Sequence, residues 1–272
     1  MTMPSLKMNN GKDIPQIGLG LWLNKNEQGC RDSVKYAIEA GYRHFDTAQI
    51  YENEQYLGQA LTENSVKRNE VFITTKIWND NLWWNGLDAT FEESLQKLQT
   101  DYVDLLLIHF PVTEERRPAW RKIEEKYKNG QAKAIGVSNY TILHLEELLK
   151  EAEIKPAVNQ VELHVFLQQP ELVKYCHQNG IVVEAYSPLA HGYRVDDPIL
   201  TGIAKKHGKT NAQIMIRWCI QIGTVALPKS THKERIKENI QIFDFSLDEN
   251  DMKELSKLES DFRTAWDPTH VP

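Results

Sequence analysis

Three hydrophobic segments in the first half of the chain carry a polar side chain at or near their end. Asp46 lies in RHFDTA, Lys76 in ITTKIW and His109 at the end of VDLLLIHF, and Tyr51 follows Asp46 closely. Taken singly, an aspartate at a strand end often caps a helix, and a lysine there often extends to solvent. A lone histidine near a core more often has a structural role than a catalytic one. Their recurrence at three successive segments indicates that they meet at one site.

These four side chains together suit proton transfer to a carbonyl group. A tyrosine phenol has a pKa of about 10 in water, which is high for acid–base catalysis at neutral pH. A nearby ammonium lowers that pKa, and Lys76 can supply the ammonium while Asp46 holds it in place. We therefore expect Tyr51 to protonate a carbonyl oxygen and His109 to donate a second hydrogen bond to that oxygen.

An alternation of apolar and amphipathic segments predicts the scaffold that brings these residues together. The expected strands are IGLGLW, RHFDTA, VFITTKIW, YVDLLLIHF, AKAIGVSN, PAVNQVEL, IVVEAYSP and TVALPKS. Each is followed by a helical stretch, and several helices stop at a glycine such as Gly41 or Gly180. Eight such units predict an α/β fold, a (β/α)8 TIM barrel with an N-terminal β-hairpin near Gly11 and extra helices near the C-terminus. Function in such a barrel lies at the C-terminal ends of the strands, where the four residues fall.

The composition excludes several classes of protein. The net charge of −6 argues against binding to nucleic acid or to an anionic membrane, which would require basic excess. Three scattered cysteines without a C-x-x-C pair predict neither a disulfide framework nor a metal site. No signal peptide, apolar run of bilayer length, linker or repeat is evident. We expect one cytoplasmic domain that covers residues 1–272.

The Rossmann dinucleotide fingerprint is incomplete, because GLGLWL has the first two glycines of G-x-G-x-x-G and lacks the third. The remaining motifs resemble those of the aldo-keto reductases over nearly the whole chain. GYRHFDTAQIYENE, VDLLLIHFP and LPKSTHKERIKEN resemble the three family signatures, with ITTKIW, IGVSNY, NQVELH and AYSPLA between them. Each motif alone is weak evidence for the family, but all of them together in this order are specific for it. The chain looks most like bacterial 2,5-diketo-D-gluconate and methylglyoxal reductases.

This resemblance implies a barrel that binds NADPH (or NADP+) in extended form, with Asp46, Tyr51, Lys76 and His109 as the catalytic tetrad. It further implies that Ser138, Asn139 and Gln160 hold the nicotinamide carboxamide and that Tyr186 stacks on the nicotinamide ring. By the same resemblance, Ser187 and Leu189 flank the pyrophosphate, and Glu238 and Asn239 hold the adenine.

The stretch PKSTHKERIKEN favours NADP over NAD. A charged run of this kind is most often a solvated start of a helix. However, it follows the eighth strand, where barrels often place a phosphate site. Lys229, Ser230 and Arg235 supply the cations and the hydroxyl that suit a 2′-phosphate.

Aromatic residues just beyond the first, third and fourth strands are expected to surround the substrate. Trp22, Trp78 and Phe110 would wall the carbonyl site together with His109, although packing at the rim is their alternative role. The loops after the fourth and seventh strands and the C-terminal tail are short. Short loops predict an open site with loose selectivity.

We therefore expect an NADP-dependent oxidoreductase that reduces small aldehydes, keto-sugars or α-dicarbonyls to alcohols and acts as a monomer without a metal. One alternative is an aldo-keto reductase-like barrel that binds NADPH in a sensing or structural role with little turnover. Another is a Schiff-base aldolase with Lys76 as nucleophile, for which Asp46 would be less useful as a permanent ion-pair partner.

Overall fold

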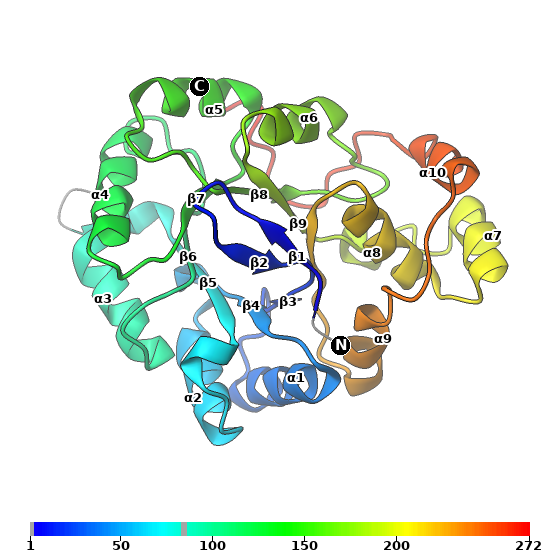
Figure 1. Ribbon diagram of the computed structural model, residues 1–272, viewed down its shortest axis with the longest axis horizontal. Coiled ribbons are helices and arrows are strands. Elements are labelled where there is room, and N and C mark those ends of the chain that lie inside the picture. Colours follow the sequence, from blue (N-terminus) through cyan, green and yellow to red (C-terminus); the bar gives the residue numbers. More distant parts are fainter. Residues whose placement is uncertain (1–2, 83–85) are drawn as a thin grey trace.

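A computed structural model describes residues 3–82 and 86–272 and shows parallel strands enclosed by helices (Figure 1). The strands are β1 (Ser5–Lys7), β2 (Asp13–Pro15), β3 (Leu19–Gly20), β4 (His44–Asp46), β5 (Phe72–Ile77), β6 (Leu105–Ile108), β7 (Ile135–Ser138), β8 (Val158–Glu162), β9 (Val182–Tyr186) and β10 (Val225–Leu227). The α-helices are α1 (Glu27–Ala40), α2 (Glu54–Glu63), α3 (Gly86–Leu98), α4 (Arg116–Lys128), α5 (Ile142–Glu151), α6 (Pro170–Gln178), α7 (Pro198–His207), α8 (Asn211–Gln221), α9 (Lys233–Ile240) and α10 (Glu249–Ser256).

Strands β3 to β10 form one parallel sheet in chain order, which closes on itself. The closure runs through backbone hydrogen bonds from Gly18 N to Ala226 O (2.9 Å) and from Gly20 N to Pro228 O (3.1 Å). Each of these strands leads into at least one helix of the outer layer. The predicted (β/α)8 barrel is therefore confirmed, with the extra helices α8 and α10 in its second half.

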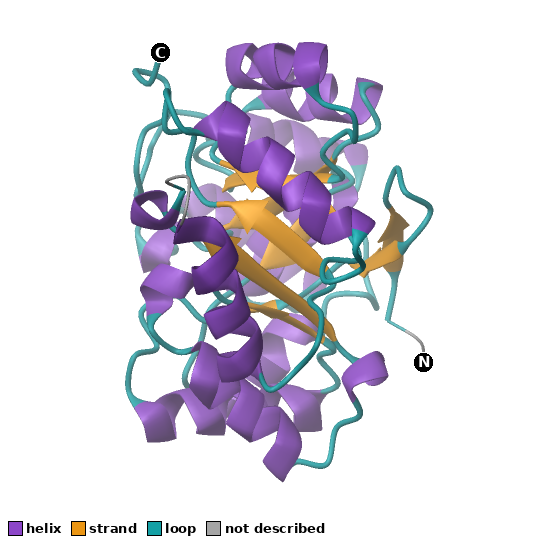
Figure 2. Ribbon diagram, turned by 90° about the vertical axis from the view of Figure 1, so that its left-hand side faces the viewer, coloured by secondary structure: helices purple, strands orange, loops and turns teal. Residues whose placement is uncertain are grey.

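The hairpin β1–β2 covers the N-terminal end of the barrel. Met8 and Ile14 of this hairpin region pack against an apolar layer inside the barrel. That layer contains Phe72, Leu105, Leu107, Val158, Val182 and Val225. Figure 2 shows the hairpin at one end of the barrel and the C-terminus toward the other. The hairpin therefore closes the N-terminal end of the barrel, and a polar functional site is expected at the opposite, C-terminal end.

Local sequence signals account for several helix ends. Thr141, Thr210 and Asp248 each begin a helix with a capping box, in which side chain and backbone satisfy each other's free donors. Gly41 ends α1 with φ 102°, a conformation that glycine adopts without a Cβ clash. Helix α4 begins at Arg116, two residues before Pro118, because proline is tolerated in the first turn of a helix.

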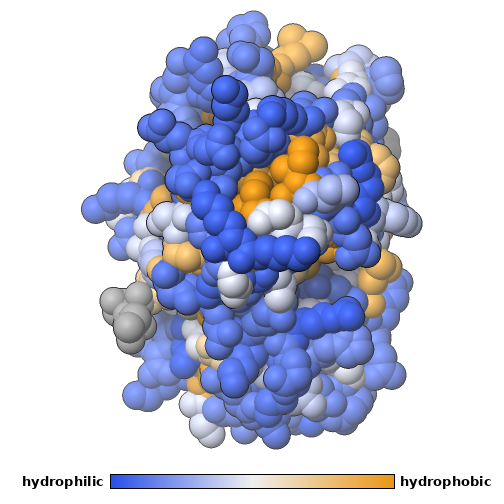
Figure 3. All heavy atoms as spheres, turned by 90° about the vertical axis from the view of Figure 1, so that its right-hand side faces the viewer, coloured by the Kyte–Doolittle hydropathy of each residue, from blue (hydrophilic) through white to orange (hydrophobic). Residues whose placement is uncertain are grey.

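The face of the molecule that carries α7 and α10 is mainly hydrophilic, with a hydrophobic patch near its centre surrounded by polar residues and smaller hydrophobic spots elsewhere (Figure 3). Within residues 3–82 and 86–272, no helix combines the length and apolar character needed to cross a bilayer.

Candidate active site

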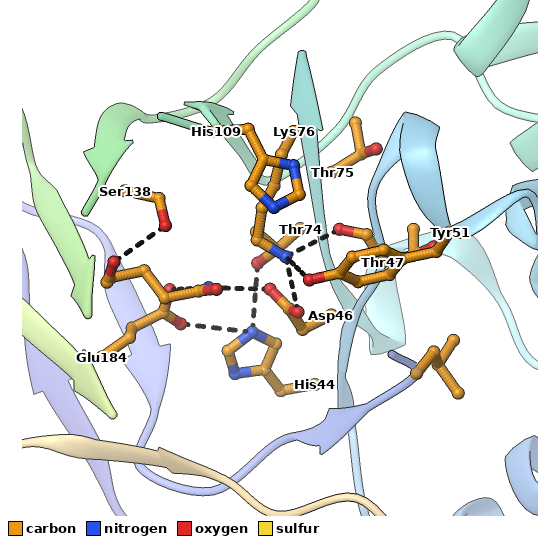
Figure 4. Close-up of polar contacts among 12 residues, drawn as sticks. His44, Asp46, Thr47, Tyr51, Thr74, Thr75, Lys76, His109, Ser138 and Glu184 are labelled. Atoms are coloured by element: carbon orange, nitrogen blue, oxygen red, sulfur yellow. Dashed lines mark hydrogen bonds and ion pairs between the residues drawn. The ribbon is translucent and has the colours of Figure 1, made fainter. Parts of the chain in front are cut away.

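The predicted tetrad converges at the C-terminal ends of the strands. Asp46 ends β4, Lys76 lies near the end of β5, and Tyr51 ends a short 3-10 helix (Gln49–Tyr51) that follows β4. The buried Lys76 Nζ donates to Asp46 Oδ1 at 2.6 Å, to Thr47 O at 2.9 Å and to Tyr51 Oη at 3.3 Å (Figure 4). The His109 and Tyr51 rings meet edge-on, with centroids 5.7 Å apart. Four side chains from three strand ends and a turn thus share one site.

Lys76 is charged despite its burial. Burial opposes the ammonium, but Asp46 and Tyr51 outweigh it, so the pKa of Lys76 is raised. The expected lowering of the Tyr51 pKa is wrong for this site. Burial raises that pKa more than the Lys76 charge lowers it, with a net upward shift. Tyr51 therefore carries its proton at neutral pH, as a hydrogen-bond donor or general acid must.

The His109 imidazole is uncharged. Burial and the charge of Lys76 hold its pKa well below the usual value. Its Nδ1 atom is buried and has no hydrogen-bond partner among the described residues. Buried polar atoms in proteins are nearly always paired, so this nitrogen marks a place that a ligand or ordered water completes.

The residues expected to hold the nicotinamide carboxamide are joined by hydrogen bonds beside the tetrad. Asn139 has φ 64°, and its Nδ2 donates to His109 O at 2.9 Å and to Ser138 Oγ at 3.1 Å. Tyr186 Oη donates to Asn139 Oδ1 at 2.8 Å, which fixes the tyrosine ring at the barrel mouth. Gln160 Nε2 donates to Asp46 Oδ2 at 2.8 Å. This polar group is thus tied directly to the tetrad.

An aromatic wall, formed by Trp22, Trp78, Phe110 and Trp266, lies against the tetrad. The Trp22 and Tyr51 rings are 5.0 Å apart, and the Trp78 and His109 rings 5.1 Å apart, between centroids. Trp266 lies within 6.3 Å of Trp22, 5.4 Å of Trp78 and 6.1 Å of Phe110. The three predicted aromatic residues are therefore brought together, and Trp266 joins them although sequence reasoning missed it.

The C-terminal tail reaches this wall because Glu162, the last residue of β8, binds it. The buried Glu162 carboxylate accepts hydrogen bonds from Thr264 N at 2.7 Å and Ala265 N at 3.1 Å, and from the Thr264 hydroxyl. Trp266 follows directly in the chain. The short tail, expected to leave the site open, thus carries a large ring onto one side of it.

The basic stretch after β10 places unpaired cations at the start of α9. The Lys229 and Arg235 side chains make no ion pair or hydrogen bond within the part of the chain that the structure describes. Ser230 is nearly buried, and its Oγ accepts from His232 N at 3.1 Å. Asn239 is buried on the same helix, while Glu238 accepts from Thr210 Oγ1 at 2.8 Å. Unpaired cations at a helix N-terminus suit an anion.

The two residues expected beside the pyrophosphate lie in the turn after β9. Ser187 has φ 49°, and its Oγ lies 2.8 Å from His191 Nε2. Leu189 is partly buried and follows in the same turn. This turn lies at the same barrel end as Tyr186.

Comparison with known proteins agrees with this geometry. A sequence model of the Aldo/keto reductase family matches residues 16–260. The chain belongs to the aldo/keto reductase family. The oxidoreductase class and the TIM barrel expected from the motifs are thereby confirmed.

Other aldo/keto reductases match along nearly their full length. The glyoxal reductase of Bacillus subtilis is 48% identical over 267 residues, which cover 98% of this chain and 97% of the relative. An aldo-keto reductase enzyme from a Medee basin deep-sea metagenome library has a TM-score of 0.95 and 41% identity, with 99% of this chain and 100% of that chain covered. The silkworm (Bombyx mori) aldo-keto reductase AKR2E5, solved with NADPH, has a TM-score of 0.92 and 36% identity, with 97% and 90% covered.

Proposed function

We propose that this aldo/keto reductase uses NADPH to reduce aldehydes and ketones, α-dicarbonyls among them, to alcohols. The observation that carries the proposal is the contact of Tyr51 Oη with the buried Lys76 ammonium at 3.3 Å, beside a neutral His109 and an aromatic wall. The relative named glyoxal reductase supports the substrate class.

The side chains divide the work on the carbonyl oxygen. Tyr51 donates its proton to that oxygen as negative charge develops, and a developing alkoxide is a much stronger base than a phenolate. Lys76 stabilises the phenolate that remains, and Asp46 keeps Lys76 charged and directed at it. His109, which is uncharged and in contact with the Tyr51 and Trp78 rings, orients the oxygen through a hydrogen bond. The aromatic wall excludes water and receives the rest of the substrate.

The residues present fit a nicotinamide dinucleotide phosphate. When bound, NADPH supplies the hydride for the carbonyl carbon. Ser138, Asn139 and Gln160 would hold its carboxamide, and the side-chain oxygen of Gln160, Oε1, has no hydrogen-bond partner among the described residues. Lys229 and Arg235, both exposed and unpaired there, would hold the 2′-phosphate.

The same geometry weighs against the two alternatives. A Schiff-base aldolase requires a lysine that can lose its proton and reach the substrate, whereas Lys76 is fully buried, paired with Asp46 and has a raised pKa. A protein that only binds NADPH has no use for a buried ion pair aimed at a phenol.

The proposal is tested by following NADPH absorbance with methylglyoxal and with an aromatic aldehyde. We expect turnover by the wild-type protein and a loss of kcat of about 10²-fold or more in Tyr51→Phe, the usual contribution of a general acid. Tyr56→Phe makes the same change on the nearby helix α2 and should leave turnover intact. Full activity of Tyr51→Phe would refute the proposal.

A further inference from the structure

A second polar layer lies inside the barrel beneath the tetrad. Its members are His44, Thr74, Gln160 and Glu184, all buried. Side chains two residues apart on a strand point the same way, so His44 lies below Asp46 on β4 and Thr74 below Lys76 on β5. Figure 4 shows His44 and Glu184 across Asp46 from Tyr51 and His109. The tetrad therefore rests on polar groups rather than on the apolar barrel core.

Glu184 is the least expected member of this layer. It stands in the middle of β9, with no exposed surface, where Val225 is its partner on β10 and Gln160 its partner on β8. The same Gln160 Nε2 that donates to Asp46 Oδ2 at 2.8 Å donates to Glu184 Oε2 at 2.9 Å. One amide group thus bridges two carboxyl groups, and among the described residues Asp46 is paired with a lysine whereas Glu184 is not.

Gly18, which has no side chain, leaves space for the imidazole ring of His44, the histidine that faces Glu184. A Cβ on Gly18 would come within 2.8 Å of His44 Cγ, so a larger residue there would displace the ring. His44 Nδ1 lies 3.4 Å from Pro15 O, an acceptor, which places the ring proton on Nδ1. His44 Nε2 then accepts from Thr74 Oγ1 at 3.1 Å. The imidazole needs no charge to satisfy these contacts.

The surroundings of Glu184 favour its uncharged form on balance, because burial and the Asp46 charge outweigh the Gln160 hydrogen bond and the Lys76 charge, which favour the carboxylate. His44 and Asp46 face it from β4 and Lys76 from β5, while β8 offers the neutral Gln160 and β10 the apolar Val225. Lys76 is already paired with Asp46, and burial lowers the pKa of His44 to about 3. Burial and the Asp46 charge raise the pKa of Glu184 to about 8.

The remaining carboxyl oxygen of Glu184 agrees with this state. Glu184 Oε1 lies 3.5 Å from His44 Nε2 and has no hydrogen-bond partner among the described residues. A carboxylate oxygen facing the lone pair of a neutral imidazole would be repelled. Protonation of the carboxyl group removes this repulsion.

We propose that Glu184 is a positioning residue, an uncharged carboxyl that holds the Gln160 amide against Asp46 and so keeps the other Asp46 oxygen on Lys76. This inference rests on the proposed function, because its effect on turnover passes through the Asp46–Lys76–Tyr51 contacts. Ionisation of Glu184 places a second anion on the shared amide, opposite a single ammonium. The Asp46–Lys76 pair is then disturbed, and turnover falls at alkaline pH.

Two variants and a matched control test this role. Glu184→Gln keeps the shape and an acceptor for Gln160 but cannot ionise, whereas Glu184→Leu removes the acceptor. Val225→Ala changes the neighbouring interior position on β10 without touching the polar layer. For each protein, kcat and KM are measured from pH 6 to about pH 10 with a small aldehyde, and thermal unfolding is followed over the same range and down to about pH 4.

We expect Glu184→Gln to keep kcat within about twofold at pH 7 and to lose the alkaline decline. Glu184→Leu should lower kcat about 10-fold with little change in the KM of the aldehyde, since a misdirected proton donor slows the chemical step. Val225→Ala should lower the melting temperature only. Wild-type kcat in Glu184→Leu, or an unchanged alkaline decline in Glu184→Gln, would overturn the proposal.

Unfolding provides a readout that does not depend on activity. Because the folded-state pKa of Glu184 is raised above its ordinary value of 4.5, its protonation stabilises the fold fully below that value. This stability is lost as the pH rises toward about 8. Over this pH range the melting temperature of the wild-type protein should therefore fall relative to that of Glu184→Gln. Parallel curves of melting temperature against pH for these two proteins would contradict the proposal. This comparison does not require Glu184→Leu to fold. If no carbonyl compound is reduced, the proposed function fails while this comparison still stands.

Discussion

Glu162 joins the barrel to the C-terminal tail, and Glu162→Gln tests whether the tail sets the substrate site. The carboxylate accepts two backbone N–H groups and the Thr264 hydroxyl, and lies 3.1 Å from His164 Nε2. Glutamine keeps one acceptor oxygen but turns an NH2 group toward a donor. The substitution therefore weakens the attachment of the tail without altering a residue that contacts Tyr51 or Lys76.

The size of the effect follows from the bonds that are lost. A hydrogen bond to a charged group contributes about 1.5–3 kcal/mol, so losing one such bond weakens tail docking by about 2 kcal/mol. That corresponds to roughly 30-fold in the docking equilibrium. Because Trp266 contacts Trp22, Trp78 and Phe110, a loosened tail removes one side of the aromatic wall. We expect the KM of a bulky aromatic aldehyde to rise about 10-fold and the kcat for methylglyoxal to change little.

The assay compares both substrates in Glu162→Gln, in Trp266→Ala and in Glu171→Gln, the same change at an exposed position of α6. Burial raises the pKa of Glu162, but the hydrogen bonds from His164 and Thr264 together outweigh it, so the pKa is lowered. A lowered pKa means that this stabilisation is complete above the ordinary value of 4.5 and is lost as the pH falls through the folded-state pKa. The wild-type KM for the aromatic aldehyde should thus rise only in acid. Equal kinetics in Glu162→Gln and wild type, or a loss of methylglyoxal turnover, would refute the reasoning.

The other predictions concern the ion pair and the phosphate site. Lys76→Met should reduce kcat at least 100-fold, since it removes the charge that stabilises the Tyr51 phenolate. It should also destabilise the fold by about 3–5 kcal/mol through an unpaired buried carboxylate, as measured by denaturant unfolding. Activity near wild type would show that Tyr51 needs no ammonium. Arg235→Ala and Lys229→Ala should each raise the KM for NADPH about 10-fold or more and leave that for NADH unchanged. Lys237→Ala on the same helix is the control, and an equal effect there would indicate general charge attraction.

The barrel and the convergence of the tetrad could be predicted from the sequence because both depend on local patterns. Apolar segments that alternate with amphipathic ones predict strands and helices, and β4, β5 and β6 are neighbours in space because they are neighbours in the chain. Parallel neighbours place their C-terminal ends together. Asp46, Lys76 and His109 therefore had to meet once the barrel was inferred.

Two features of the site depend on contacts that no local pattern encodes. Trp266 lies in a tail without regular structure, and its position depends on Glu162 at the end of β8, far away in the chain. The net shift of the Tyr51 pKa is a balance between burial and the charge of Lys76. The sequence shows that both are present but does not show how deeply the phenol is buried.

Glu184 is a different case, because its signal was present in the sequence. In IVVEAY the carboxyl stands two residues before Tyr186, and alternate residues of a strand face the same side. A tyrosine expected to face the cofactor therefore predicts that Glu184 points into the barrel, where an unpaired carboxylate is strongly disfavoured. Such a residue must either find a cation or hold a proton. In the structure the nearest cation, Lys76, is paired with Asp46. Glu184 therefore has no lysine to neutralise a negative charge, and it remains uncharged.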